Sequence, residues 1–115
     1  MAKKITVYEK PTCTTCRKLA VLLKDNGIGY DKVNYFIEPF TEEILTRLIA
    51  KTGVRPIKLT LGAAAAGLTD ETADADVIKA MVADPNLIQR PIVEMGDKAV
   101  LARPVDRALE LLQGL

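Results

Sequence analysis

The feature that most constrains this chain is a pair of cysteines, Cys13 and Cys16, placed where a strand gives way to a helix. Residues 5–8 are β-branched and aromatic, which predicts a short strand that stops at Pro11. Over residues 14–26, apolar side chains recur at helical spacing and glycines follow, which predicts a helix. Cys13 is therefore expected at the N-terminal edge of this helix, with Cys16 one turn inside it.

This placement predicts redox chemistry at the two sulfurs. The thiolate is the reactive form of cysteine, and the free backbone N–H groups at a helix N-terminus favour a negative charge. Cys13 is then the nucleophile, and Cys16 faces it as a thiol that can resolve an adduct on Cys13. Lys10 and Arg17 flank the pair and would lower the thiol pKa further.

Three structural interpretations of the pair are weaker. A zinc site needs three or four ligands, whereas the chain has two cysteines and no histidine, so no metal site is predicted. A structural disulfide is a poor explanation in a compartment that keeps thiols reduced. Cys16 alone could instead be a core residue of the helix, since free cysteine is often buried. The lack of histidine also excludes the Cys-His and Ser-His arrangements of hydrolases.

Length and charge bound the rest of the interpretation. The chain has 115 residues, 49% of them apolar, and we predict a single domain over residues 1–115. A formal charge of +1 supplies no general field for holding nucleic acid or an anionic membrane. No stretch approaches the roughly 20 apolar residues of a membrane span, and none resembles a signal peptide. We expect a cytoplasmic monomer without direct nucleic-acid or membrane contacts.

A second strand and a second helix follow the cysteine motif. Residues 30–36 predict the strand, with Tyr35 and Ile37 on one side of it. Thr41 and the acidic residues after it are typical of a helix start, and Gly53 is typical of a helix end.

Residues 54–87 are predicted to form a helical insertion. A helix within it would begin at Thr69 or Thr72 and end near Asp84. We assign no chemistry to the alanine-rich part of this segment.

A hairpin and a closing helix complete the chain. Residues 91–95 and 98–102 form two strand-like runs around a short Gly-Asp turn, and an apolar helical pattern follows Pro104. The resulting order is strand, helix, strand, helical insertion, hairpin and helix. This order is the thioredoxin-like, glutaredoxin-type α/β arrangement, in which helices flank a mixed sheet.

Three motifs resemble one known family. Residues 8–18 (Tyr-Glu-Lys-Pro-Thr-Cys-Thr-Thr-Cys-Arg-Lys) look like the cysteine loop of the thioredoxin-fold arsenate reductases, the ArsC family, and of its Spx-like relatives. Residues 88–93 (Ile-Gln-Arg-Pro-Ile-Val) look like a second signature of the family, and residues 102–104 (Ala-Arg-Pro) resemble a third.

The resemblance implies an activity and roles for residues. Cys13 would attack arsenate, Arg90 and Arg103 would contact the oxyanion, and Pro91 would be the family's cis-proline facing the cysteine loop. No cofactor would stay bound. Glutathione would serve as a co-substrate, and glutaredoxin or thioredoxin would be a protein partner.

Two departures from the family pattern bear on this transfer. Aligned on Val54 and Arg55, the family's further arginine falls on Leu59, and Lys58 is the nearest cation. Cys16 occupies a position where the arsenate reductases have serine, which points to intramolecular disulfide chemistry. We therefore count Lys58, together with the cations beside the cysteines, among the candidate oxyanion-binding residues.

Alternatives remain open at this level. Arg90 could simply pair with an acidic side chain, and Arg103 could pair with Asp106. The chain could also be an Spx-like redox regulator that binds RNA polymerase, or a glutathione-binding relative without arsenate activity.

Overall fold

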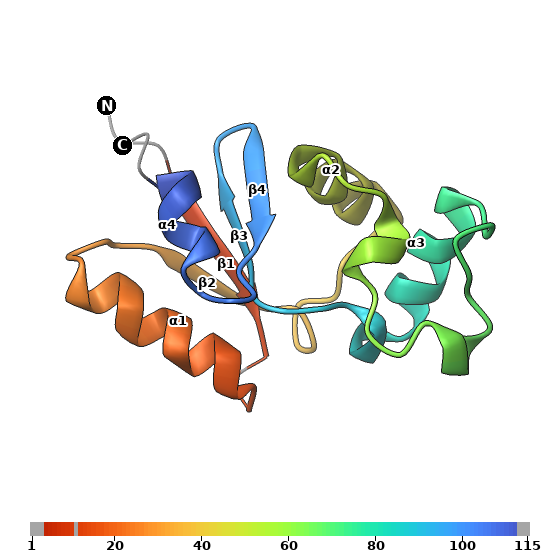
Figure 1. Ribbon diagram of the computed structural model, residues 1–115, viewed down its shortest axis with the longest axis horizontal. Coiled ribbons are helices and arrows are strands. Elements are labelled where there is room, and N and C mark those ends of the chain that lie inside the picture. Colours follow the sequence, from red (N-terminus) through yellow and green to blue (C-terminus); the bar gives the residue numbers. More distant parts are fainter. Residues whose placement is uncertain (1–3, 11, 113–115) are drawn as a thin grey trace.

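The computed structural model describes residues 4–10 and 12–112, so Pro11 and both ends of the predicted domain lie outside the described residues. Its centre is a four-stranded sheet in the order β2-β1-β3-β4, in which β1 and β2 are parallel and the other pairs are antiparallel (Figure 1). The predicted mixed sheet is confirmed. The strands are β1 (Ile5–Glu9), β2 (Asp31–Asn34), β3 (Ile92–Met95) and β4 (Lys98–Leu101).

Helices cover both faces of the sheet (Figure 1). On one face α1 (Thr14–Asp25) and α4 (Arg107–Leu112) enclose an apolar cluster with alternate residues of β1 and β3. On the other face α2 (Glu42–Thr52) packs with the insertion around a second cluster. The period-2 alternation of β1 decides which side chain joins which cluster: Ile5 and Val7 face α1, whereas Tyr8 faces α2.

Helix α2 begins and ends where the sequence predicts. The Thr41 hydroxyl accepts a hydrogen bond from the Ile44 N–H at 3.1 Å, which caps the helix. Gly53 ends it in the left-handed region, at a φ of 73°, where glycine carries no steric penalty. No helix among the described residues is long and apolar enough to cross a membrane.

Strand β2 is shorter than predicted, because Asn34 closes a turn. Its side-chain oxygen accepts from the Phe36 N–H at 3.0 Å, and its carbonyl accepts from the N–H groups of Ile37 and Glu38. The prediction that Tyr35 and Ile37 share one side of a strand is therefore wrong. Tyr35 turns into the core and is fully buried, whereas Ile37 is 77% exposed.

Residues 54–87 contain one helix and several short turns. Helix α3 follows two 3₁₀ turns and precedes a third, and its apolar face packs against α2. The elements are η1 (Pro56–Leu59), η2 (Ala64–Ala66), α3 (Asp74–Ala83) and η3 (Pro85–Leu87).

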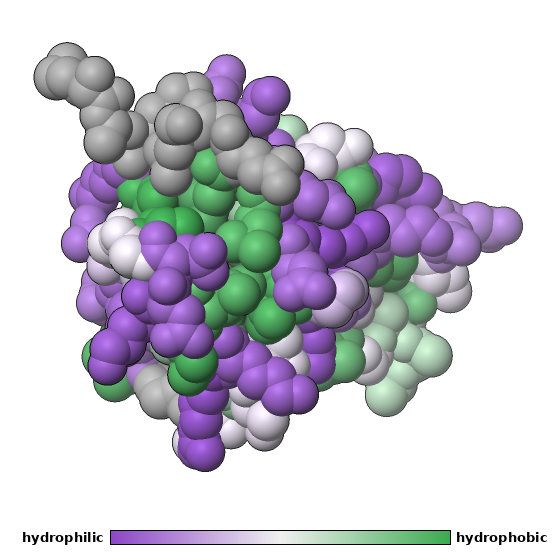
Figure 2. Space-filling view, turned by 60° about the vertical axis from the view of Figure 1, so that its left-hand side comes forward, coloured by the Kyte–Doolittle hydropathy of each residue, from purple (hydrophilic) through white to green (hydrophobic). Residues whose placement is uncertain are grey.

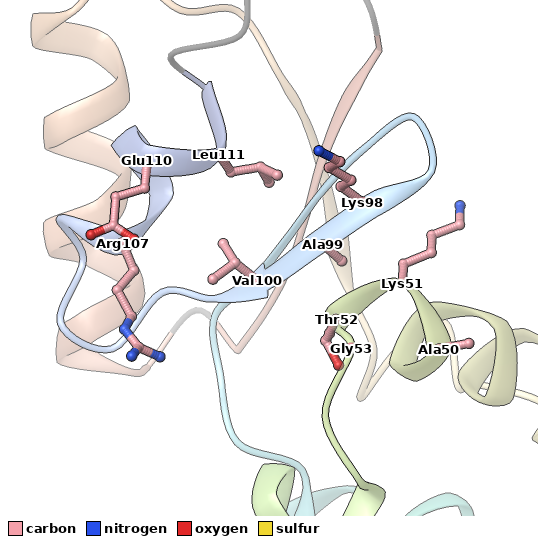
Figure 3. A pocket seen from close by; sticks show the side chains of 10 residues that line it. All are labelled: Ala50, Lys51, Thr52, Gly53, Lys98, Ala99, Val100, Arg107, Glu110 and Leu111. Carbon is pink, nitrogen blue, oxygen red and sulfur yellow. The ribbon is translucent and has the colours of Figure 1, made fainter.

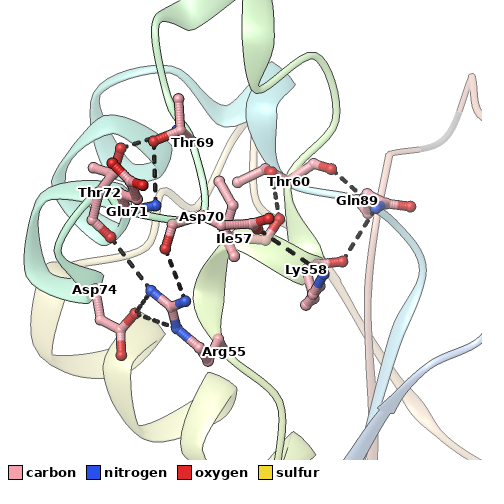
Figure 4. Close-up of polar contacts among 10 residues, drawn as sticks. All are labelled: Arg55, Ile57, Lys58, Thr60, Thr69, Asp70, Glu71, Thr72, Asp74 and Gln89. Atoms are coloured by element: carbon pink, nitrogen blue, oxygen red, sulfur yellow. Dashed lines mark hydrogen bonds and ion pairs between the residues drawn. The ribbon is translucent and has the colours of Figure 1, made fainter.

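The predicted start of α3 at Thr69 or Thr72 is wrong. The Thr72 hydroxyl accepts from the Thr69 N–H at 2.9 Å, and the Thr69 hydroxyl accepts from the Glu71 N–H at 3.2 Å (Figure 4). Both candidate caps are thus used inside their own turn, and the helix starts at Asp74 without a side-chain cap.

Arg55 ties this turn to the end of α2. Its guanidinium donates to the Asp74 carboxylate at 3.1 and 3.2 Å and to the Asp70 carbonyl at 2.9 Å (Figure 4). The insertion is therefore held by its own polar contacts as well as by the apolar packing of α3.

Candidate functional site

Cys13 sits at the junction predicted for it, as the N-cap residue of α1. Its backbone is extended, with a φ of −81°, and its N–H donates to the Lys10 carbonyl at 2.9 Å. Its carbonyl accepts the first helical hydrogen bond, from the Arg17 N–H at 3.1 Å. The side chain is half-buried, so the sulfur is open to a small reactant while it faces the free N–H groups of the first helical turn.

The surroundings of Cys13 favour its thiolate. Desolvation by partial burial would raise the pKa of the thiol, but four contacts outweigh it. The backbone N–H groups of Cys16 and Thr15, the Cys16 thiol and the positive charge of Arg90 each lower the pKa of Cys13, although its side chain makes no capping hydrogen bond. The net result is a Cys13 pKa below the ordinary thiol value of 9.0.

Cys16 is the opposite case. Its side chain is buried on the sheet-facing side of α1, together with Leu19 and Leu23. Burial is the largest reason that the pKa of Cys16 rises to about 12, and the negative charges of Cys13 and Glu9 add to it. The surroundings therefore favour the thiolate at Cys13 and the protonated thiol at Cys16.

Arg90 reaches the site from the segment that leads into β3. Its Nη1 donates to the Ile88 carbonyl at 3.0 Å and to the Tyr35 hydroxyl at 3.3 Å. The charge of Arg90 and its hydrogen-bonding interaction with Cys13 favour the thiolate. Burial alone would lower the pKa of Arg90, but its interactions with neighbouring groups outweigh burial, and the pKa is raised overall. The Arg90–Pro91 peptide bond is cis, the isomer implied by the resemblance.

Tyr35 is a part of the site that the sequence analysis missed. Its hydroxyl donates to the Ile88 carbonyl at 3.0 Å while it accepts from Arg90, so the three groups close a triangle. Its ring stacks on Phe36 and on Phe40, with centroids 5.0 and 5.4 Å apart, respectively. A tyrosine at the end of a strand-like run indicates only a core residue, and nothing in the sequence signals its hydroxyl contacts.

Arg103 reaches the first turn of α1 from the segment that follows β4. Its Nη2 donates to the Thr15 hydroxyl in the first turn of α1 at 3.4 Å. Thr15 is one of the two residues whose backbone N–H groups lower the pKa of Cys13. The bond from Arg103 to Pro104 is also cis, which the sequence analysis did not predict. Residues from three distant segments, around Cys13, Arg90 and Arg103, thus meet at one helix end.

Comparison with known proteins places this arrangement in a family: the model of the ArsC family matches residues 8–111. The chain belongs to the ArsC family. It is 30% identical to the uncharacterized protein YfgD of Escherichia coli over 97% of this chain and 99% of that protein. It is 31% identical to an arsenate reductase of Haemophilus influenzae, over 94% and 98%, respectively.

A solved structure agrees with the fold. An arsenate reductase from Vibrio cholerae superposes with a TM-score of 0.85 at 26% identity, covering 96% of this chain and 98% of that one. The fold is therefore thioredoxin-like, and the relatives support a thiol-dependent, arsenate reductase-like function for this ArsC-family chain.

Two further cations lie near the cysteine loop. The Lys10 Nζ stands 4.7 Å from the centroid of the Phe36 ring, and the Arg90 guanidinium carbon stands 5.9 Å from the same centroid. Arg17 follows Cys16 directly in α1 and is exposed. These contacts bring Lys10 to the same aromatic ring as Arg90.

Lys58 and Leu59 belong to the insertion. The Lys58 Nζ is 4.0 Å from the Asp70 carboxylate, and its backbone carbonyl accepts from Gln89 (Figure 4). Leu59, at the position of the family's further arginine, is only 2% exposed and packs in the apolar cluster of α2 and α3. A position that supplies a cation in arsenate reductases therefore supplies core packing here.

No cluster of three or more potential ligands for a metal ion occurs in the part of the chain that the structure describes.

A groove of about 520 Å³ runs between α2, β4 and α4, and it contains neither cysteine (Figure 3). In the space-filling view hydrophilic side chains cover most of the face turned forward, with an apolar area among them (Figure 2). The reactive sulfur lies at the helix end, separate from this groove.

Proposed function

We propose that this chain reduces arsenate by nucleophilic attack of Cys13. The observation that carries the proposal is the environment of the Cys13 sulfur, which combines backbone N–H donors of α1 with the guanidinium of Arg90. The same donors that favour a thiolate would stabilise the extra negative charge of a tetrahedral oxyanion bound to it.

The first chemical step would be substitution without a change in oxidation state. The Cys13 thiolate attacks arsenic and a sulfur–arsenic bond forms, while the bond from arsenic to one hydroxyl group breaks and that group takes up a proton from solvent and leaves as water. Arg90 and Arg103 would hold the remaining oxygens, since a guanidinium pairs well with a tetrahedral oxyanion. Lys10 and Arg17 would add positive charge at the rim of the site.

The second step would carry the reduction. A second thiol, from Cys16 or from glutathione, attacks the Cys13 sulfur, and a disulfide forms between the two sulfurs. The sulfur–arsenic bond breaks and its electron pair stays on arsenic, which leaves as arsenite, As(III). The two sulfurs have been oxidised, and glutathione with glutaredoxin, or thioredoxin, would reduce the disulfide.

The experiment that tests this function is NADPH-linked turnover of arsenate with glutathione and glutaredoxin. We expect Cys13→Ser to abolish turnover, whereas Arg47→Ala, a surface arginine paired with Glu43 within α2, should turn over like the wild type. Turnover that survives in Cys13→Ser would contradict the mechanism. Cys16→Ser separates the two thiols: full activity in this variant would show that glutathione alone resolves the adduct.

A second function of the same site is favoured by Cys16 and Leu59. A buried thiol beside Cys13 suits thiol–disulfide exchange, and the apolar Leu59 removes one contact that an oxyanion would use. The chain would then reduce a glutathione mixed disulfide. Absence of arsenate turnover, together with Cys13-dependent release of glutathione from a glutathionylated peptide, would select this function.

A further inference from the structure

Glu9, the last residue of β1, is the one carboxylate that is buried among residues 4–10 and 12–112. Its side chain is 9% exposed, and the chemistry at Cys13 described above makes no use of it. Carboxylates are seldom buried without a partner, because desolvating the charged form is costly. A buried acid next to a reactive centre therefore calls for a chemical explanation.

Two periodic patterns bring Glu9 to Cys16. Along β1 every second side chain faces α1, so Glu9 continues the row of Ile5 and Val7. Along α1 the sheet-facing stripe begins with Cys16 and continues with Leu19. Glu9, the last residue of the row on β1, and Cys16, the first residue of the stripe on α1, therefore lie at the same end of the β1–α1 interface.

The electrostatics of Cys16 agree with this placement. The backbone N–H of Lys10, the residue directly after Glu9, lowers the pKa of Cys16. The charge of Glu9 acts in the opposite direction and raises the pKa of that thiol. The Glu9 carboxylate is therefore within electrostatic reach of the Cys16 sulfur.

The other neighbours of Glu9 leave it able to take up a proton. Desolvation raises the pKa of Glu9, and the charge of Lys32 on β2 lowers it to a smaller extent. The facing residue on β2 is Asn34, which carries no charge. Within residues 4–10 and 12–112, no hydrogen bond or ion pair joins the Glu9 carboxylate to another group.

A resolving thiol needs such an acceptor. Cys16 must lose its proton before it can attack, yet burial holds its pKa at about 12, so hydroxide in solution would remove the proton inefficiently near neutral pH. We propose that Glu9 is the base that accepts the Cys16 proton when Cys16 attacks an adduct on Cys13. This inference rests on the resolving role of Cys16 in the proposed function.

The same substitution would resolve any adduct on Cys13. The Cys16 S–H bond breaks and its proton moves to the Glu9 carboxylate, while the Cys16 sulfur forms a bond to the Cys13 sulfur. The bond from Cys13 to the leaving group breaks, and the leaving group departs with the electron pair, as arsenite or as a thiolate. Both protein sulfurs are oxidised, and the neutral Glu9 then releases the proton to solvent.

The test uses one equivalent of the chromogenic disulfide 5,5′-dithiobis(2-nitrobenzoate) and the full-length reduced protein. Attack by Cys13 releases one coloured thiolate, and attack by Cys16 on the resulting mixed disulfide releases the second. We expect Glu9→Gln to leave the first rate constant within about twofold and to slow the second by roughly 10²-fold, the low end of general-base effects. Glu94→Gln, a carboxylate-to-amide change on β3, is the matched control and should slow neither.

The pH profile distinguishes a base from a structural residue. In the wild type the second rate constant should fall as pH falls through the Glu9 pKa and level off above it. In Glu9→Gln it should instead rise about tenfold per pH unit through the neutral range, because hydroxide must then remove the proton. Glu9→Asp keeps the carboxylate and should recover part of the rate, and melting curves should show that all variants are folded.

Two results would overturn the inference, and they differ. If Glu9→Gln matches the wild type at every pH while Cys16→Ser lacks the second release, Glu9 is not the base although Cys16 resolves the adduct. If Cys16→Ser retains the second release at the wild-type rate, the resolving role fails and the inference fails with it. Neither result depends on whether arsenate is a substrate.

Discussion

The cysteine end of the sheet and the helical insertion use polar side chains in different ways. At the cysteine end, backbone donors of α1 and the guanidinium of Arg90 converge on one half-buried sulfur. In the insertion, the Arg55 guanidinium donates its hydrogen bonds to the Asp74 carboxylate and to the backbone of the preceding turn. Arg55 is exposed and Arg90 is half-buried, and only Arg90 places its charge close to a thiol sulfur.

The two regions meet just before Arg90. Thr60 in the insertion bridges to Ile88, the Leu61 N–H donates to the Leu87 carbonyl at 2.7 Å, and the Gln89 N–H donates to the Leu59 carbonyl at 2.9 Å. Residues 87–89 are therefore clamped by the insertion. The insertion thus fixes the backbone from which Arg90 extends, and in the proposed mechanism it would act on the chemistry only through that residue.

The largest effect should come from the core of the insertion. Leu59→Ala removes a side chain that is 2% exposed, and a cavity of this kind costs about 2–5 kcal/mol of the free energy of unfolding. The measurement is urea unfolding, with Leu61→Ala as the control, because Leu61 is 43% exposed. The pKa of Cys13 should stay low in the folded variant. A cost below about 1 kcal/mol would contradict a core role for Leu59.

Loss of Arg90 should have a nearly equal effect, but on activity. We expect Arg90→Ala to lower kcat/KM for the Cys13-dependent reaction about 10²–10³-fold, or about 2.7–4 kcal/mol, as removal of an oxyanion donor does. Arg55→Ala is the contrasting variant: it should lower stability by about 1 kcal/mol without changing kcat/KM, because its contacts lie within the insertion. The comparison fails if both arginines affect catalysis equally.

Much of the fold follows from the sequence because its signals are local. The strand before Cys13, the helix after it and the hairpin around Gly96 each depend on neighbouring residues, and each lies where it was predicted. The predicted element bounds are wrong where a polar side chain can form hydrogen bonds with several local partners. Asn34 ends β2 early, and Thr72 serves its own turn in place of a helix cap.

The site was less accessible to sequence reasoning because it is assembled from distant segments. The position of Cys13 between a predicted strand and a predicted helix indicates its role, and Arg90 lies in a segment that resembles a family signature. The role of Tyr35 depends on a contact over 55 residues, which no local pattern encodes. The burial of Glu9 next to Cys16 becomes visible only when the faces of β1 and α1 are known.

Removal of the Tyr35 hydroxyl should have a smaller effect. Tyr35→Phe takes one acceptor from Arg90, whose Nη1 still donates to the Ile88 carbonyl, so we expect kcat/KM to fall about fivefold, or about 1 kcal/mol. Tyr8→Phe is the control, because Tyr8 also packs on Phe40 but donates to Glu94. Kinetics of Tyr35→Phe in the Arg90→Ala background should show no further loss; an additive loss would place Tyr35 outside the Arg90 interaction.

The ionisation of the two thiols makes the stability of the fold depend on pH. Because the Cys13 pKa is lower in the folded chain than the ordinary 9.0, its thiolate stabilises the fold above pH 9 and this stabilisation is lost as pH falls through the folded pKa. The Cys16 pKa is raised to about 12, so its contribution is complete below pH 9 and is lost as pH rises toward 12.

The two contributions together predict a maximum of stability near pH 9, which urea midpoints between pH 7 and pH 11 would detect. Cys13→Ser should flatten the low-pH side of this maximum, and Cys16→Ser the high-pH side. Arg90→Ala should raise the pKa of Cys13 only modestly, because the backbone donors of α1 act on the sulfur more strongly than the guanidinium does. Iodoacetamide labelling at Cys13 as a function of pH measures that shift, and a return to 9.0 would make Arg90, and not the helix end, the main cause of the thiolate.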